Sequence, residues 1–391
     1  MNKKITLLLL ITSWLSIAQN NISKIIVDEE TKKPLISATI NNSNDHTITN
    51  EDGRFIFFSN NDSISIRMLG YKELNTTFQE LNTSSDTLYL SEKPIFLDEI
   101  ILKNYKNLIF KTYNNIQNNY AHFSHSDKFF LRCVLKRNDS IMKIEDISGK
   151  IKRNSIFASR EIPKLNYEFQ LLNQRKIGLL NKDKKIEDFK LQTIENLFMW
   201  FSTVFINPNQ FEFTEERLAD SIYTKVNFNP LNEYPNKAIG YYIINNKDKS
   251  IKEYQSKTNP LFAQEIVYEE KQGFKWRTID TDLSITYDYS KKNNKYFISN
   301  AVLKQTIELF NRKSEKTNYE VEYNLIVTEP FSEISNFETN VKSNKELFKI
   351  DIDYDKEFWL NQNQLPLTNE LNKFIKNVKK YEKEYDIISN F

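Results

Sequence analysis

Alternation of apolar and polar residues dominates the middle of this chain. It is clearest in Ser284-Ile285-Thr286-Tyr287-Asp288-Tyr289 and in Tyr319-Glu320-Val321-Glu322-Tyr323-Asn324-Leu325, and polar turns such as 245–248 separate these runs. Successive strand residues point to opposite faces, so this pattern predicts an antiparallel sheet with one face on a core and the other in water. We therefore expect residues 127–360 to form a large, curved antiparallel β-domain.

Three segments depart from this alternation and predict helices. Apolar residues recur every three or four positions in 103–126, as in an amphipathic helix, and we expect a helical linker there. A similar spacing follows Pro366 and predicts a C-terminal helix within 361–391. Residues 194–205 (Ile194 to Phe205) are apolar without alternation, and we expect an inserted helix that covers the half-open sheet.

The first hundred residues read as short strands separated by turns. Ile36, Ala38 and Ile40 alternate with polar residues, and Asp52-Gly53 stands between two strand-like runs. An Asp-Gly pair in that setting is a strong hairpin signal, because glycine tolerates the positive φ of the turn. Repeated short strands with little helix predict a β-sandwich over residues 19–102. The expected fold class is thus mainly β, with a sandwich, a larger antiparallel sheet and a few helices.

The order of several short motifs in this first part resembles a known family. The motifs are Val27-Asp28, Lys33-Pro34-Leu35, Ala38-Thr39-Ile40, Thr49-Asn50-Glu51-Asp52-Gly53-Arg54-Phe55 and Ile66-Arg67-Met68-Leu69-Gly70-Tyr71. They are similar to those of the carboxypeptidase-regulatory-like domain. The resemblance implies a transthyretin-like β-sandwich without catalytic residues, found at the N-terminus of exported or outer-membrane proteins of Gram-negative bacteria. The remainder resembles exported proteins of unknown function.

The start of the chain has the pattern of an export signal. Lys3 and Lys4 precede an apolar run from Ile5 to Ile17, and small residues stand before a cut after Ala18. These are the features of a secretory signal peptide, here residues 1–18. The run is shorter than the ~20 residues that cross a bilayer as a helix, so we expect cleavage rather than anchoring. The expected location is the periplasm or outer membrane of a Gram-negative bacterium, with peripheral association with that membrane as one option.

Charge and cysteine content narrow the function classes. The chain has 54 Lys and Arg against 52 Asp and Glu, a balance that gives no overall field to attract nucleic acid. Its one cysteine, Cys133, cannot form an intramolecular disulfide and lies in an alternating run. We expect it to be a buried structural thiol.

The sequence offers two groups of candidate metal ligands. His122 and His125 are three residues apart at the end of the predicted linker helix, where one helical face would place them together for zinc. The alternative is two solvated imidazoles. Carboxylates alternate with other residues in two short runs, which suits either calcium or a solvated strand face, and we expect the latter. These carboxylates are Asp351, Asp353, Asp355, Asp280 and Asp282.

The sequence contains none of the common catalytic motifs, and it predicts no cofactor site. The chain has no Gly-x-Ser-x-Gly elbow and no His-Glu-x-x-His pair. Trp200, Trp276 and Trp359 either line a groove or belong to the core. The leading hypothesis is a non-enzymatic exported envelope protein that binds a protein, lipid or glycan in a concave apolar site. The alternative is a secreted hydrolase whose metal or carboxylate site the spacing of residues does not reveal.

Overall fold

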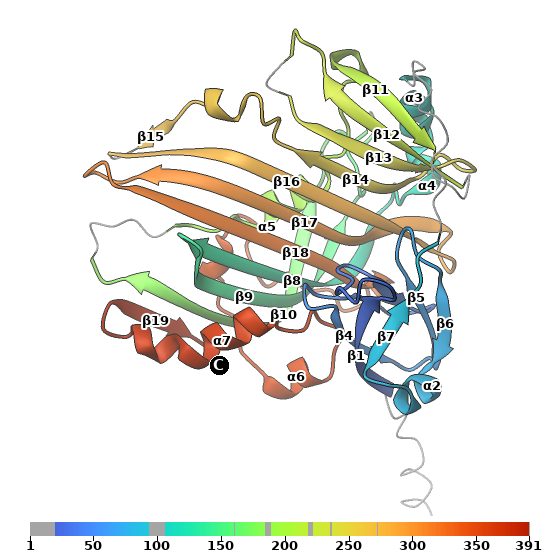
Figure 1. Ribbon diagram of the computed structural model, residues 1–391, viewed down its shortest axis with the longest axis horizontal. Coiled ribbons are helices and arrows are strands. Elements are labelled where there is room, and N and C mark those ends of the chain that lie inside the picture. The colour runs from blue at the N-terminus through green and yellow to red at the C-terminus, as the bar shows by residue number, and fades with distance from the viewer. Residues whose placement is uncertain are drawn as a thin grey trace, which may run out of the picture.

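The computed structural model describes residues 20–93, 106–159, 161–183, 189–217, 222–234, 237–271 and 273–390. It confirms a mainly β fold with one large antiparallel sheet and a few helices (Figure 1). The predicted signal peptide, residues 1–18, lies outside the described residues. Within them, no helix is long and apolar enough to cross a membrane.

The first part of the chain forms two small sheets packed on one core. In one sheet the strand order is β4-β1-β7, and in the other it is β3-β2-β5-β6. Ile26, Phe55, Ile40 and Ile66 are fully buried between the sheets. We call residues 20–90 the sandwich. Its elements are β1 (Asn20–Asp28), β2 (Thr39–Asn41), β3 (His46–Ile48), β4 (Arg54–Ser59), β5 (Ser63–Arg67), β6 (Leu74–Thr77), α2 (Phe78–Thr83) and β7 (Thr87–Leu90).

The turn at Asp52-Gly53 differs from the predicted hairpin. Gly53 has φ of +70°, as expected for such a turn, but β3 and β4 belong to different sheets. The Asn50 side chain accepts hydrogen bonds from the backbone N–H groups of Asp52 and Arg54, at 3.0 and 2.9 Å. These two hydrogen bonds close the turn. The turn leads the chain from one sheet to the other, so the strands before and after it do not pair with each other.

The large sheet has twelve strands, all paired antiparallel. Its order is β11-β12-β13-β14-β16-β17-β18-β8-β9-β10-β19, and β15 pairs with β16 beside this path. The bounds are β8 (His125–Arg137), β9 (Ser140–Arg153), β10 (Tyr167–Asn181), β11 (Phe211–Arg217), β12 (Tyr223–Pro230), β13 (Ile239–Asn245), β14 (Ile251–Lys257), β15 (Glu269–Lys271), β16 (Phe274–Ser290), β17 (Lys295–Phe310), β18 (Lys316–Ser332) and β19 (Tyr385–Ser389).

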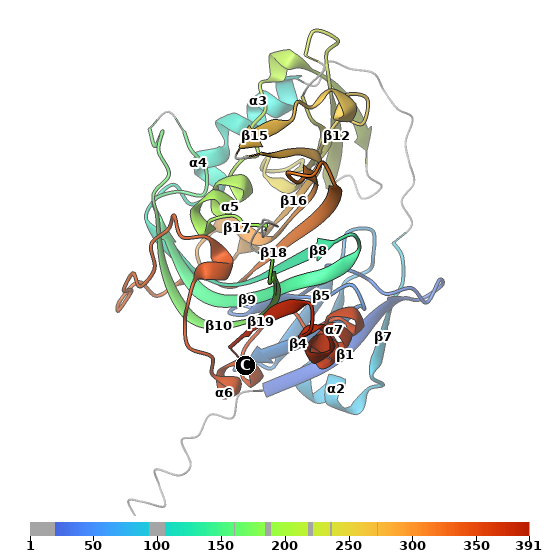
Figure 2. The ribbon, with the colours of Figure 1, turned by 90° about the vertical axis from the view of Figure 1, so that its left-hand side faces the viewer.

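The path of the chain through the sheet explains where its helix lies. The chain runs outward from β8 to β10, crosses by α5 (Ile194–Phe201) to β11, and returns strand by strand until β18 pairs with β8. The sheet curves around α5, as Figure 2 shows. Buried Phe198 of α5 packs on Phe129 of β8 and Phe169 of β10, each with ring centroids 5.3 Å apart. The helix thus covers one half of the concave face.

Two short helices lie in the segment expected to be a helical linker. α3 (Lys106–Asn114) and α4 (Ile116–Asn119) bury Ile109 and Ile116 in the core of the large sheet. The helical residues end at Asn119, and the first strand of the large sheet begins at His125. The helix is therefore shorter than the pattern predicted.

The C-terminal segment is helical only in part. α6 (Lys356–Leu360) and α7 (Asn369–Asn377) are short, and the 3₁₀ turn Val378–Tyr381 follows α7. The prediction of one helix to the end is wrong, because Tyr385–Ser389 forms β19 and pairs with β10. The apolar spacing holds through Leu371, Phe374 and Val378, which are buried. Beyond Val378, the edge of β10 would otherwise be unpaired, and the chain pairs with it as a strand instead of continuing as a helix.

Residues 361–368 attach the sandwich to the convex face of the large sheet, and we call them the strap. Asn363 exchanges two hydrogen bonds with the backbone of Phe58 in β4, at 2.8 and 2.9 Å. On its other side the strap offers the carbonyls of Leu365 and Pro366 to Arg132 of β8, at 2.9 and 2.8 Å. Both views place the sandwich against the outside of the curve (Figures 1 and 2).

The interface between sandwich and sheet contains both apolar and ionic contacts. Ile48, Phe130, Ile326, Trp359 and Leu365 form a separate small core there. Nearby, the buried carboxylate of Asp288 in β16 contacts two cationic side chains and one histidine. These are Lys252 of β14, Arg67 of β5 at 3.7 Å and His46 of β3 at 3.6 Å.

Candidate functional site

The concave face of the large sheet contains a groove beside α5. Its wider part has a volume of about 550 Å³ and its narrower part about 320 Å³, and Thr278 lines both. We call the two parts together the concave groove. Both volumes lie within the roughly 300–1,000 Å³ typical of ligand pockets. Apolar and aromatic residues line much of it: Trp200, Tyr254, Phe262, Leu283, Trp276, Ile307, Leu309 and Tyr323.

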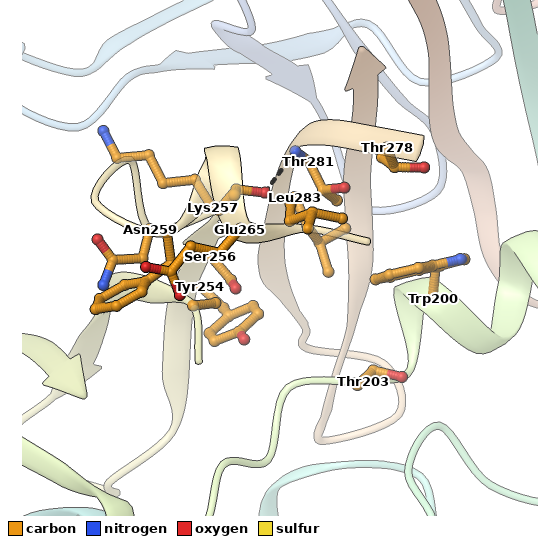
Figure 3. Close-up of a pocket in the computed structure, with 14 residues that line it drawn as sticks. Trp200, Thr203, Tyr254, Ser256, Lys257, Asn259, Glu265, Thr278, Thr281 and Leu283 are labelled. Carbon is orange, nitrogen blue, oxygen red and sulfur yellow. Dashed lines mark hydrogen bonds between the residues drawn. The ribbon is translucent and has the colours of Figure 1, made fainter. Parts of the chain in front are cut away.

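Strand alternation gives this groove its wall. Tyr254 and Ser256 of β14 pair with Ile285 and Leu283 of β16, so their side chains share the concave face. Figure 3 shows Tyr254, Ser256 and Leu283 together on one side of the wider part. The loop after β14 is held in place by the backbone N–H of Thr281, which donates to Thr258 Oγ1 at 2.8 Å.

Helix α5 supplies the opposite wall. Thr193 caps its N-terminus by accepting a hydrogen bond from the backbone N–H of Asn196, at 3.2 Å. The helix is apolar on more than one side, so Leu197 and Phe201 are buried in the core while Met199 and Trp200 remain exposed. In Figure 3 the indole of Trp200 extends from α5 toward the strand that carries Leu283.

Charged side chains stand only at the edge of the concave groove. Among the described residues that line it, Lys257, Glu265 and Lys190 are charged, and all three are exposed. Inside, burial raises the pKa of Tyr254 to about 12, so its phenol stays neutral at physiological pH. The interior therefore offers apolar surface together with neutral hydroxyl and amide groups, which suits an uncharged, apolar chain.

The loop that borders the wider part exposes large aliphatic side chains. Leu261 is 81% exposed and Val267 82% exposed, on either side of the 3₁₀ turn Ala263–Glu265. Phe262 and Ile266 of the same loop line the groove. Apolar surface thus continues from the groove to its opening, the arrangement expected where an apolar ligand enters.

The structure places His122 and His125 in separate hydrogen-bond networks. His122 lies between the hydroxyls of Ser155 and Ser159, both at 3.2 Å from its ring nitrogens. His125 begins β8, so the two residues do not share the helical face that the sequence suggested. Its Nδ1 donates to the Phe123 carbonyl at 2.9 Å, and its Nε2 accepts from Arg153 at 3.2 Å.

The environment of His125 further disfavours a charged ring. Burial lowers the pKa of His125, and the adjacent Arg153 adds to this, although Asp127 acts in the opposite direction. Across the described ranges, no three His, Cys, Asp or Glu side chains are placed to hold a metal ion. The zinc hypothesis gains no third ligand from the described residues.

The two runs of alternating carboxylates lie in different settings. Asp351, Asp353 and Asp355 precede α6 in an irregular segment instead of a strand, and all three are exposed. Asp355 accepts the backbone N–H of Glu357 at 2.9 Å and so caps α6. Asp280 and Asp282 are on the convex face of β16, away from the concave groove.

Two of the three tryptophans predicted to line a groove or the core lie in the groove, whereas the third tryptophan and the cysteine are buried. Trp200 and Trp276 line the concave groove, while Trp359 is 2% exposed and packs between Phe130 and Arg175 at the sandwich interface. Cys133 is fully buried on β8, and burial raises the pKa of its thiol well above the usual value. It is a core residue, as the alternation around it suggested.

Sequence reasoning missed the polar and loop residues of the groove. Thr278 precedes a β-bulge, where two residues of β16 oppose one of β17, so its place is hidden by the broken alternation. Leu261 and Val267 lie in a loop whose position depends on the strands around it. A clue was present in that loop, since several large apolar residues stand outside any alternating run.

Comparison with known proteins gives no close relative. No family model matches the chain, and no curated protein sequence matches it. Solved structures that are similar include a domain described as an outer membrane lipoprotein-sorting protein from Vibrio parahaemolyticus, with 7% identity, 59% of this chain and 93% of that chain covered, and a TM-score of 0.25.

Two further solved structures are similar to part of the chain. A LolA superfamily protein from Nitrosomonas europaea has 6% identity, covers 59% of this chain and 98% of its own, and has a TM-score of 0.17. Lipovitellin has 10% identity, with 57% of this chain and 27% of lipovitellin covered, and a TM-score of 0.22. At these scores the similarities do not establish function.

Proposed function

We propose that this protein is an exported cell-envelope protein that binds an apolar ligand, such as a lipid acyl chain, in the concave groove. One observation carries the proposal: apolar and neutral side chains line the groove, and the charged residues that line it are confined to its edge. A charged or strongly polar ligand would lose hydration inside without gaining a partner. An acyl chain instead replaces water along the whole groove.

The proposed location rests on the first residues of the sequence. The basic start and the apolar run from Ile5 to Ile17 have the order of a secretory signal. The resemblance of residues 19–102 to the carboxypeptidase-regulatory-like domain agrees with this location. We assign the sandwich an accessory role, because the groove is built by the large sheet and α5.

Intrinsic fluorescence tests this function directly. Without residues 1–18, the chain keeps three tryptophans, of which Trp200 and Trp276 line the groove and Trp359 is buried elsewhere. Bromine atoms quench indole fluorescence only at short range, so 9,10-dibromostearate is the probe. We expect saturable quenching in the wild type, and only the unquenched Trp359 signal in a Trp200→Phe, Trp276→Phe variant. Equal quenching of Trp359 would contradict binding in the groove.

A filling substitution provides the matched control. Thr278→Phe places a ring where the two parts of the groove meet and is expected to weaken stearate binding about tenfold or more, since the ring occupies ligand volume. Lys275→Phe adds the same ring to the other face of β16, at an exposed position. Stearate affinity unchanged in both variants would overturn the proposal.

A further inference from the structure

A second cleft lies on the convex side of the large sheet, where the sheet meets the sandwich. Its volume is about 560 Å³. The turn between β3 and β4 contributes Glu51 and Asp52, and α7 contributes Glu370 and Leu371. The remaining walls are side chains of β8, β16, β17 and β18, together with the strap. We call it the junction cleft.

The junction cleft is strongly acidic. Seven carboxylates line it against three cationic side chains. Each of the three cations already has a carboxylate partner: Arg132 binds Asp146 through two hydrogen bonds, Lys136 binds Glu370 at 2.9 Å and Lys304 binds Glu322 at 3.0 Å. Arg132 shares Asp146 with Arg175, and both Arg132 and Lys304 lower the pKa of Glu51, so the cations offset part of the remaining negative charge. Three cations still face seven carboxylates, and those without a direct cationic partner named above are Glu51, Asp52, Asp280, Asp282 and Glu320.

The remaining carboxylates create a site for positive charge. Asp280 and Glu320 are exposed, on β16 and β18. Desolvation within the cleft raises the pKa of Glu51, and repulsion from Glu322 raises it further. A bound cation would relieve this repulsion, because unlike charges in a partly desolvated cleft attract more strongly than in bulk water.

A second, independent observation points to a ligand with hydrogen-bond donors. Asn324 of β18 lines the cleft and is 7% exposed, and its Oδ1 has no hydrogen-bond partner among the described residues. Buried side-chain oxygens in folded proteins nearly always accept a hydrogen bond. The oxygen itself is buried beneath the wall of the acidic cleft, and rotation of the Asn324 amide would turn it into the cleft, where an ammonium or guanidinium group can donate to it.

We propose that the junction cleft binds a basic segment of a partner polypeptide, with a lysine or arginine side chain reaching Asn324. The acidic groups are spread along two strands and a turn, and no described set of three converges on a point as a metal ion requires. An extended chain with several cationic side chains matches that spread. The proposal is independent of the ligand of the concave groove, which opens on the other face of the sheet.

Fluorescein-labelled hexalysine tests the proposal by fluorescence anisotropy with the full mature chain. We expect saturable binding at 150 mM salt, where charges more than about 8 Å apart are largely screened. In an Asp280→Asn, Glu320→Gln variant we expect affinity to fall roughly five- to tenfold, since two exposed carboxylates are lost. Absence of saturable hexalysine binding to the wild type would overturn the proposal, as would binding of Ca²⁺ alone.

Two further variants distinguish binding of hexalysine in the junction cleft from non-specific attraction to negative charge elsewhere on the protein. Asp353→Asn, Glu357→Gln removes the same charge at exposed positions near α6, and hexalysine affinity should stay unchanged. Asn324→Leu removes the unpaired acceptor without altering charge, and we expect roughly tenfold weaker binding. An equal loss of affinity in the Asp353, Glu357 variant, or none in Asn324→Leu, would contradict the assignment. Dibromostearate quenching should be the same in all these variants, so each proposal can fail alone.

Discussion

At the scale of single residues, the large sheet buries ionisable groups on both faces. On the convex side, Asp146 is fully buried and binds both Arg132 and Arg175. Burial alone would raise the pKa of Asp146, but the two guanidinium groups outweigh it and hold that pKa below the usual value. On the concave side, Glu145 accepts a hydrogen bond from Gln174, and its second oxygen has no partner within the described structure.

The protonation of Glu145 makes folding stability depend on pH. Burial raises the pKa of Glu145 from 4.5 to about 8. The folded protein therefore binds this proton more tightly than the unfolded chain, and the stability that Glu145 contributes falls as pH rises from about 4.5 to 8. Glu145→Gln keeps the shape without the charge. We expect it to leave stability at pH 4.5 nearly unchanged and to raise it by roughly 3–4 kcal/mol at pH 8.

Urea unfolding of both proteins at several pH values measures this difference. Glu168→Gln on β10 is the matched control, because the Glu168 side chain is half exposed and its pair with Lys152 lies at the surface. The control should shift stability by less than about 1 kcal/mol at any pH. A stability gain for Glu145→Gln that does not grow with pH would show that Glu145 is ionised in the folded state.

At the scale of elements, β19 closes one side of the large sheet. It pairs with β10 over five register positions, and Arg137 of β8 contacts the hydroxyl of Tyr385. A chain that ends after Glu384 would leave the edge of β10 unpaired. Such edges promote association between molecules. We expect this truncation to lower the melting temperature and to produce concentration-dependent oligomers in size-exclusion chromatography with light scattering.

A single substitution in β19 separates backbone pairing from side-chain packing. Ile387→Ala keeps the backbone hydrogen bonds to β10 and removes a half-buried side chain. It should destabilise the protein modestly and leave it the same size in solution as the wild type. If the truncated chain also keeps that size, β19 does not protect the edge of the sheet.

The pattern of apolar and polar residues predicted strands well where strands that are adjacent in sequence also pair in the sheet. It predicted them poorly where the pairing joins segments that are distant in sequence. Alternation revealed β16 to β18, because each strand packs one face on a continuous core. It failed for β19, whose partner β10 is far away in sequence, and for Asp52-Gly53, whose strands pair elsewhere. The concave groove was expected in outline from residues 194–205. Its lining by Thr278 depends on a bulge that no local pattern reveals.

At the scale of the whole molecule, Asp288 links the sandwich to the large sheet. Burial would raise its pKa, but Lys252, His46 and Arg67 hold that pKa far below the usual value. The stabilising contribution is thus present above the ordinary pKa of about 3.9 and is lost only in strong acid. Asp288→Asn leaves three cationic or polar groups without their carboxylate. We expect faster hydrogen exchange in β2, β3 and β5, with β8 and β17 unchanged.

Asp282→Asn is the matched control for this exchange experiment. Asp282 lies on the same face of β16 but lines the junction cleft instead of contacting the sandwich strands β3 and β5. Exchange in β2, β3 and β5 should then equal that of the wild type. If Asp288→Asn leaves exchange in these strands unchanged, the apolar contacts around Ile48 and Trp359 hold the sandwich in place without the ion cluster.

The strap has a consequence for the order of events during biogenesis. Synthesis delivers the sandwich first, yet the outer edge of β4 meets its partner Asn363 only 305 residues later. Until then that edge has no strap to cover it and is open to unwanted pairing. Completion of the earliest domain therefore waits for nearly the last part of the polypeptide. A chain interrupted before the strap would therefore lack the segment that covers this edge of β4.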